Sequence, residues 1–128
     1  MITFAFASDG KSLATSAWER GTHVYDLSGA PRERAFLQGH GALVASAAFF
    51  DGGRKLATLA SPFLDIDNPP RTCQLWIWDL AGGRTLHEWT LPTILHMVGA
   101  APDGRHLAAV SDEGLVYIFR LASGSGKK

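Results

Sequence analysis

The strongest constraint on the fold is a short motif that occurs three times along the chain. Each copy has a glycine, a basic residue directly after it, and Leu-Ala after one further position; the copies lie at 10–14, 53–57 and 104–108. An aromatic residue follows the motif leucine by 12 positions in the first and third copies and by 22 positions in the second. Once this insertion is set aside, the copies recur about every 40 residues, which is typical of a structural unit that stacks on its own repeats.

The units are predicted to consist of strands. Short apolar and β-branched segments alternate with turn residues, and Asp9-Gly10, Gly52-Gly53 and Asp103-Gly104 are typical of tight hairpin turns. We expect strands near 2–7, 12–17, 22–26 and 33–37, near 43–50, 55–60, 73–79 and 85–90, and near 94–100, 106–110 and 115–121. Both faces of the resulting sheets are apolar, and small sheets of this kind stack radially.

With these features the sequence resembles the WD-repeat β-propeller family. The resemblance rests on Gly39-His40 before a strand, the Asp-Gly hairpins, Leu-Ala-Thr in the second strand and Trp78-Asp79 at the end of the third. It covers nearly all of residues 2–121 and implies an all-β fold, a partial β-propeller of four-stranded antiparallel blades. The repeats are expected at about 2–38, 42–90 and 93–121, the last without its outer strand, and 122–128 as a flexible tail.

In that family, a histidine, a serine or threonine, an aspartate and a tryptophan form a hydrogen-bonded framework inside a blade. The resemblance implies this structural role for His40, Thr58 and Trp78 in the second repeat, Thr15 and Tyr25 in the first, and Ser111 and Asp112 in the third. Phe119 has no N–H to donate, so the third blade is predicted to be held by packing. Trp76 and Trp78 are accordingly predicted to be framework rather than a ligand site.

The insertion in the second repeat, within 61–71, is the clearest departure from the repeat pattern. It joins the second and third strands and carries apolar residues beside acids, which suggests a contact surface; folding back onto the rim as a small lid is the alternative. The predicted rim contacts are Trp18, Arg20, His40, Phe63, Leu64, Asp65, Asp67 and Arg71.

Charge and cysteine content narrow the classes of partner. Twelve basic residues balance twelve acidic ones without clustering, which disfavours nucleic acid as a partner. No apolar segment approaches the roughly 18 residues of a membrane-spanning helix, and the first residues do not have the pattern of a signal peptide. The single cysteine, Cys73, excludes an internal disulfide. We therefore expect a cytoplasmic protein with no nucleic-acid or membrane partner.

No motif predicts catalysis, a metal site or a cofactor. His87-Glu88 begins like a zinc-protease motif, but Leu91 stands where the second histidine belongs. The sequence thus predicts a non-catalytic module that binds a protein or peptide, as a scaffold or a regulatory appendage. The alternatives are a fragment of an enzymatic or small-ligand-binding propeller with a site in the central channel, and a chain that only completes a ring. The channel residues would be Thr3, Ser46, Thr93 and His96.

Three blades are too few to close a ring, because four is the usual minimum. Two apolar end faces would remain in water, at a cost in free energy comparable with the whole stability of a domain. The sequence therefore predicts either that the blades belong to a longer propeller or that copies of the chain associate head to tail as a homo-oligomer.

Overall fold

The computed structural model describes residues 2–18, 20–40, 42–61, 72–111 and 113–121. These residues form antiparallel strands and contain no helix. The described part of the chain therefore has no helix that could cross a lipid bilayer. The described strands are β1 (Ile2–Phe6), β2 (Ser12–Ala17), β3 (Thr22–Asp26), β4 (Arg32–Leu37), β5 (Leu43–Phe50), β6 (Lys55–Ser61), β7 (Cys73–Asp79), β8 (Arg84–Leu91), β9 (Met97–Ala100), β10 (His106–Val110) and β11 (Val116–Arg120). The prediction of an all-β fold is confirmed.

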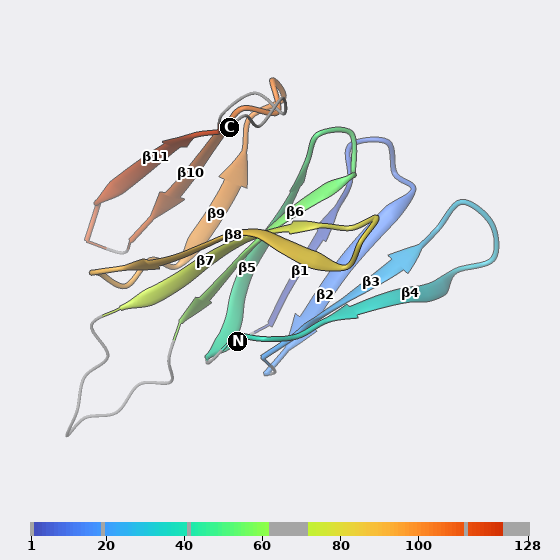
Figure 1. Ribbon diagram of the computed structural model, residues 1–128, viewed down its shortest axis with the longest axis horizontal. Helices are drawn as coiled ribbons and strands as arrows, with labels where there is room; N and C mark the ends of the chain where they lie inside the picture. The colour runs from blue at the N-terminus through green and yellow to red at the C-terminus, as the bar shows by residue number, and fades with distance from the viewer. Residues whose placement is uncertain (1, 19, 41, 62–71, 112, 122–128) are drawn as a thin grey trace.

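The strands are divided among three sheets, which we call blade one (β1–β4), blade two (β5–β8) and blade three (β9–β11). Within each sheet, strands that are consecutive in the chain are hydrogen-bonded neighbours. Blade two lies between the other two, and the first strands of the blades, β1, β5 and β9, lie next to one another (Figure 1). Blade three has three strands within the described part of the chain, so β11 is its outer edge there.

The repeated glycines form the hairpin turns between the first and second strands of each blade. The backbone N–H groups of Gly10, Gly53 and Gly104 donate to carbonyl oxygens three residues earlier, at 2.9, 3.2 and 3.1 Å. Their φ angles are 74°, 84° and 71°, values that glycine adopts without the steric cost a side chain brings. The Leu-Ala pair that follows each glycine then enters the second strand of its blade with one residue on each face.

The strand predicted at 94–100 is shorter in the structure, where β9 begins at Met97. His96 before it still donates its backbone N–H to the carbonyl oxygen of Val110 on β10 at 2.8 Å, whereas Leu95 packs in the core. Leu95 is fully buried between blades two and three, and its carbonyl oxygen accepts a hydrogen bond from the Ser61 hydroxyl at 2.9 Å.

Two apolar clusters hold the blades together, and each lies between neighbouring blades. The first contains Ala14, Val24, Leu37, Ala47, Leu56, Trp78 and Leu80. The second contains Phe50, Ala57, Leu59, Cys73, Leu75, Ile77, Leu91, Leu95, Val98, Leu107 and Ala109. Blade two is therefore covered on both faces, whereas blades one and three each contribute only one face to these clusters.

Candidate interaction surfaces

A buried hydrogen-bonded chain joins three parts of blade two. The indole N–H of Trp78 on β7 donates to Oγ1 of Thr58 on β6, with 2.8 Å between the nitrogen and the oxygen. Nε2 of His40, which precedes β5, lies 2.7 Å from the same hydroxyl oxygen. The structure thus brings together the three blade-two residues that the sequence analysis named.

The fourth member of this chain is Gln74, which the sequence analysis did not predict. Its Oε1 lies 2.8 Å from Nδ1 of His40, and since an amide oxygen only accepts, Nδ1 carries the proton. Nε2 is then an acceptor for the Thr58 hydroxyl. Burial lowers the pKa of His40, which keeps the ring neutral and suits this pattern. Gln74 could have been found from strand alternation, because it shares a face of β7 with Trp76 and Trp78.

Steric contacts as well as hydrogen bonds explain why glycine and histidine occupy positions 39 and 40. The rings of His40 and Trp76 stack with centroids 4.2 Å apart. Gly39 lies under Trp76 at a φ of 139°, and a Cβ there would come within 2.8 Å of the indole Cζ3. His40 is buried, so this predicted rim residue lies inside the blade, where a partner would not touch its ring.

Among the described residues of blades one and three, no such hydrogen-bonded chain is present. The side chains of Thr15 and Tyr25 are not joined by a hydrogen bond in the described structure; the buried Ser16 hydroxyl instead donates to the carbonyl of Gly21 at 2.7 Å. The hydroxyl of Ser111 accepts from two backbone N–H groups in the turn between β10 and β11. Its predicted partner, Asp112, lies outside the described residues.

Two of the predicted rim residues lie on the surface of the turn between β2 and β3. Trp18 is 57% exposed and has a φ of 55°, and Arg20 is exposed two residues later. The other predicted contacts, Phe63, Leu64, Asp65, Asp67 and Arg71, lie outside the described residues.

Each blade has two different faces, which the strand registers define. The aromatic face carries the leucine of the repeat motif and the aromatic residue paired with it: Leu56 with Trp78 in blade two, Leu107 with Phe119 in blade three, Leu13 with Tyr25 in blade one. The opposite, aliphatic face carries Ala57 and Ile77 in blade two, Ala108 and Ile118 in blade three, and Ala14 and Val24 in blade one.

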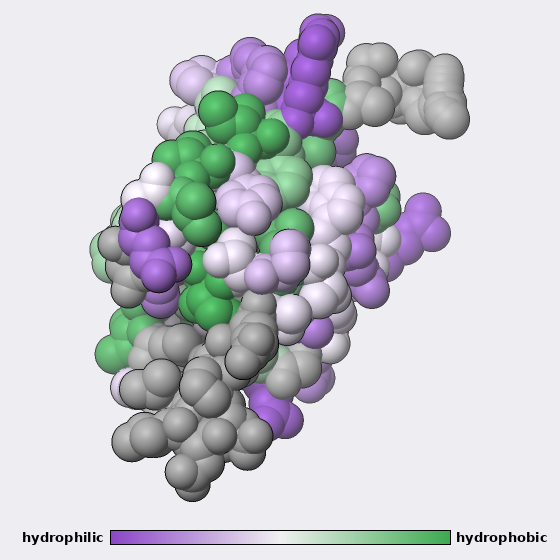
Figure 2. All heavy atoms as spheres, turned by 90° about the vertical axis from the view of Figure 1, so that its left-hand side faces the viewer, coloured by the Kyte–Doolittle hydropathy of each residue, from purple (hydrophilic) through white to green (hydrophobic). Residues whose placement is uncertain are grey.

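One face of each end blade is exposed and apolar. Blade one exposes its aromatic face, on which Phe4 is 67% accessible. The ring of Phe6 lies edge-on to the ring of Phe4, with 6.1 Å between the ring centroids. Blade three exposes its aliphatic face, on which Ile118 is 72% accessible. Figure 2 shows apolar side chains gathered over the side of the molecule that carries blade three. The exposed large apolar residues of blade three are Met97, Val110, Leu115, Val116 and Ile118.

Comparisons with known proteins place this architecture. No protein-family model matches the chain, and no curated protein matches it. Among solved structures, the β-propeller domain of Cps50 (Swd1) from Myceliophteria thermophila superposes with a TM-score of 0.76. The match covers 95% of this chain at 18% sequence identity. This chain folds as part of a β-propeller. It spans 36% of the matched chain, and the predicted all-β fold, a partial β-propeller of antiparallel blades, is confirmed.

One polar residue considered for a channel site is engaged within the fold. The Ser46 hydroxyl, one of the residues considered for a channel site, accepts a hydrogen bond from the backbone N–H of Val98 at 3.0 Å and so joins blades two and three. Among the described residues, no group of three or more His, Cys, Asp or Glu side chains is placed to hold a metal ion.

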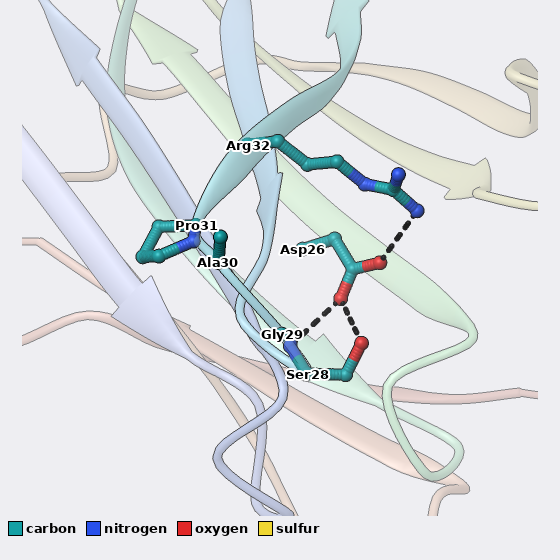
Figure 3. Close-up of a pocket in the computed structure, with 6 residues that line it drawn as sticks. All are labelled: Asp26, Ser28, Gly29, Ala30, Pro31 and Arg32. Atoms are coloured by element: carbon teal, nitrogen blue, oxygen red, sulfur yellow. Dashed lines mark hydrogen bonds and ion pairs between the residues drawn. The ribbon is translucent and has the colours of Figure 1, made fainter.

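Polar contacts join several of the residues that line a hollow at the turn between β3 and β4 (Figure 3). Oδ1 of Asp26 accepts from the hydroxyl and the backbone N–H of Ser28 at 2.6 and 2.9 Å, and Oδ2 lies 3.4 Å from the guanidinium of Arg32. The hydrogen bonds from Ser28 lower the pKa of Asp26. The carboxylate therefore serves to shape the turn.

Proposed function

We propose that this propeller segment is a non-catalytic protein-interaction module whose main contact surfaces are the two exposed blade faces. The observation that carries the proposal is a contrast between equivalent positions. Leu75 and Ile77 on the aliphatic face of blade two are 0% and 1% exposed, whereas Val116 and Ile118 at the same places in blade three are 58% and 72% exposed. Apolar positions that are buried in one repeat and accessible in the next indicate a face made to be covered.

The rim between β2 and β3 supports a second contact. Tryptophan and arginine contribute more than most residues to binding energy at protein interfaces, and Trp18 and Arg20 lie together on this surface. Because stacked sheets hold such a turn in place, little conformational entropy is lost when a partner binds. Phe63, Leu64, Asp65, Asp67 and Arg71 belong to the same proposed surface. The proposal keeps the cytoplasm as the location.

The test is photo-crosslinking in cells that produce the chain. A benzophenone amino acid is placed at Ile2 or Ile118 on the end faces, and in a control at Leu86 on β8, an exposed apolar position on the outer strand of blade two. We expect abundant protein adducts from the two end positions and few from the control. Adducts from positions 2 and 118 that do not exceed those from position 86 would rule out the end faces as protein-binding surfaces.

A further inference from the structure

We propose that the partner of the two end faces is a second copy of this chain, bound head to tail, so that two copies close a six-bladed ring. This inference rests on the proposed function and names the partner. In each of the two contacts, the aliphatic face of blade three of one copy packs on the aromatic face of blade one of the other.

The contacts between blades inside the chain have a direction. Between blades one and two, the aliphatic face of blade one, with Val24, meets the aromatic face of blade two, with Trp78. Between blades two and three, the aliphatic face of blade two, with Ile77, meets the aromatic face of blade three, with Phe119. Each blade thus offers its aliphatic face to the aromatic face of the next, and the two faces left over at the ends are one of each kind.

The two remaining faces also complement each other in size. Phe4 occupies the place that Ala47 has in blade two and Val98 has in blade three, because all three pair with equivalent residues of the second strand. At the other end of the chain, Gly99 occupies the place of Ala48 and Ala5. At these positions the exposed aromatic face of blade one therefore has a larger side chain than its equivalents, and the exposed aliphatic face of blade three has a smaller one.

The space beside Gly99 is also unoccupied by other atoms of the chain. A Cβ added at Gly99 would meet no heavy atom within 4 Å, and the backbone φ there lies outside the left-handed region. Gly99 lines a shallow hollow on blade three with His106, Ala108 and Ile118. Inside the chain, Ala48 packs against the cluster that contains Val98, the equivalent of Phe4. The same stacking between copies would place the Phe4 ring over the hollow at Gly99.

Two copies fit the three blades that the structure describes in one chain. Propellers close with typically 4–8 blades. Two copies supply about six blades and fit this range, whereas three copies supply about nine and do not. A head-to-tail contact that closes after two copies gives a ring with a two-fold axis and two identical interfaces.

The mass in solution gives the first test. Light scattering on the purified 128-residue chain should give a single species of twice the 13.8 kDa chain mass. Phe4→Glu and Ile118→Glu should each shift this species to the single-chain mass, because each places a charge in the contact. Leu86→Glu, the same change at an apolar position on β8, should remain dimeric. A folded wild-type monomer, or an aggregate without a dimer, would overturn the proposal.

Disulfide trapping tests the direction of the contact. Phe4→Cys and Gly99→Cys are purified separately, oxidised alone and oxidised after mixing and exchange. We expect a covalent dimer only in the mixture, since a head-to-tail contact brings position 4 of one copy to position 99 of the other. Cys73 is 1% exposed and does not compete, which the oxidised wild type checks. Equal trapping of Phe4→Cys alone, or no trapping in the mixture, would overturn the head-to-tail pairing.

The two proposals fail in different ways. A monomeric wild-type chain that still forms photo-adducts with other proteins through positions 2 and 118 overturns the second copy as partner and leaves the interaction module standing. A chain that neither dimerises nor forms such adducts overturns both.

Discussion

Blades two and three have different side chains at equivalent core positions and are held together by different interactions. Blade two joins Trp78 and Thr58 to His40 by hydrogen bonds, whereas blade three has Phe119 and Ala109 at the corresponding positions and stacks Phe119 on Trp89 with ring centroids 5.2 Å apart. The strand registers of the two blades are nevertheless equivalent. Strand register and apolar packing are therefore enough to define a blade. The hydrogen-bonded chain of blade two additionally fixes the position of His40 just before β5.

The largest effect should come from truncating the covered aliphatic face of blade two. Ile77→Ala removes a side chain that is fully buried between blades, and we expect a loss of about 2–5 kcal/mol in the free energy of unfolding. The loss should be the same at every protein concentration, which urea denaturation can measure. Ile118→Ala, at the equivalent position of blade three, should lose stability only where the dimer forms. A concentration-dependent loss for Ile77→Ala would contradict the assigned interface.

The next effect concerns the polar chain itself. Thr58→Val keeps the shape of the side chain but leaves the Trp78 N–H and the His40 Nε2 without their shared partner. We expect a loss of about 1–3 kcal/mol, because both groups are buried. Thr15→Val in blade one is the matched control and should change stability by less than about 0.5 kcal/mol. If both variants lose equally, blade one holds a polar chain that its threonine supports.

A loss in the same range, of about 1–3 kcal/mol, is expected for Gly39→Ala. The new Cβ would stand 2.8 Å from the Trp76 ring, at a φ of 139° that side chains rarely adopt. Gly29→Ala is the control, since a Cβ there meets no heavy atom within 4 Å. Thermal unfolding of the two variants measures the difference. An unchanged midpoint for Gly39→Ala would mean that Trp76 does not pack on the Gly-His turn.

The smallest predicted effect is a dependence on pH. Burial lowers the pKa of His40 below its ordinary value of 6.5, while Gln74 and the charge of Glu88 partly oppose this shift. The unfolded chain therefore takes up a proton at a higher pH than the folded chain does. The resulting stabilisation is fully present above pH 6.5 and is lost as the pH falls through the folded pKa.

Denaturation at several pH values between about 7.5 and 5 should show this loss for the wild type. His40→Asn should be less stable throughout but should have a flatter profile. The lowered pKa values of Asp26, Asp51 and Asp103 act below their ordinary value of 3.8, outside this window. An identical slope for His40→Asn and the wild type would exclude His40 as its source.

The sequence predicted the strands and hairpins well because these depend on local signals. Alternation along the chain locates the strands, and the glycines at 10, 53 and 104 locate the turns between them. The start of β9 was predicted too early, since the withdrawal of Leu95 from the ladder depends on a bond to Ser61 on another strand.

The candidate sites were less predictable than the fold. Gln74 is separated from His40 by 34 positions, and the two come together because β6 pairs with β5 on one side and with β7 on the other. That the end faces would be apolar followed from the repeat pattern. That Phe4 enlarges one face where Gly99 reduces the other required the strand registers, because neither residue is unusual by itself.

A crystal structure of the 128-residue chain is the most direct test of the central claim, that each end blade has a face made for another blade of the same kind. The account predicts that Ile118 of one copy is buried against the aromatic face of blade one in a second copy, with the Phe4 ring over Gly99. Both faces left in solvent, or a pairing of two aliphatic faces with each other, would contradict it.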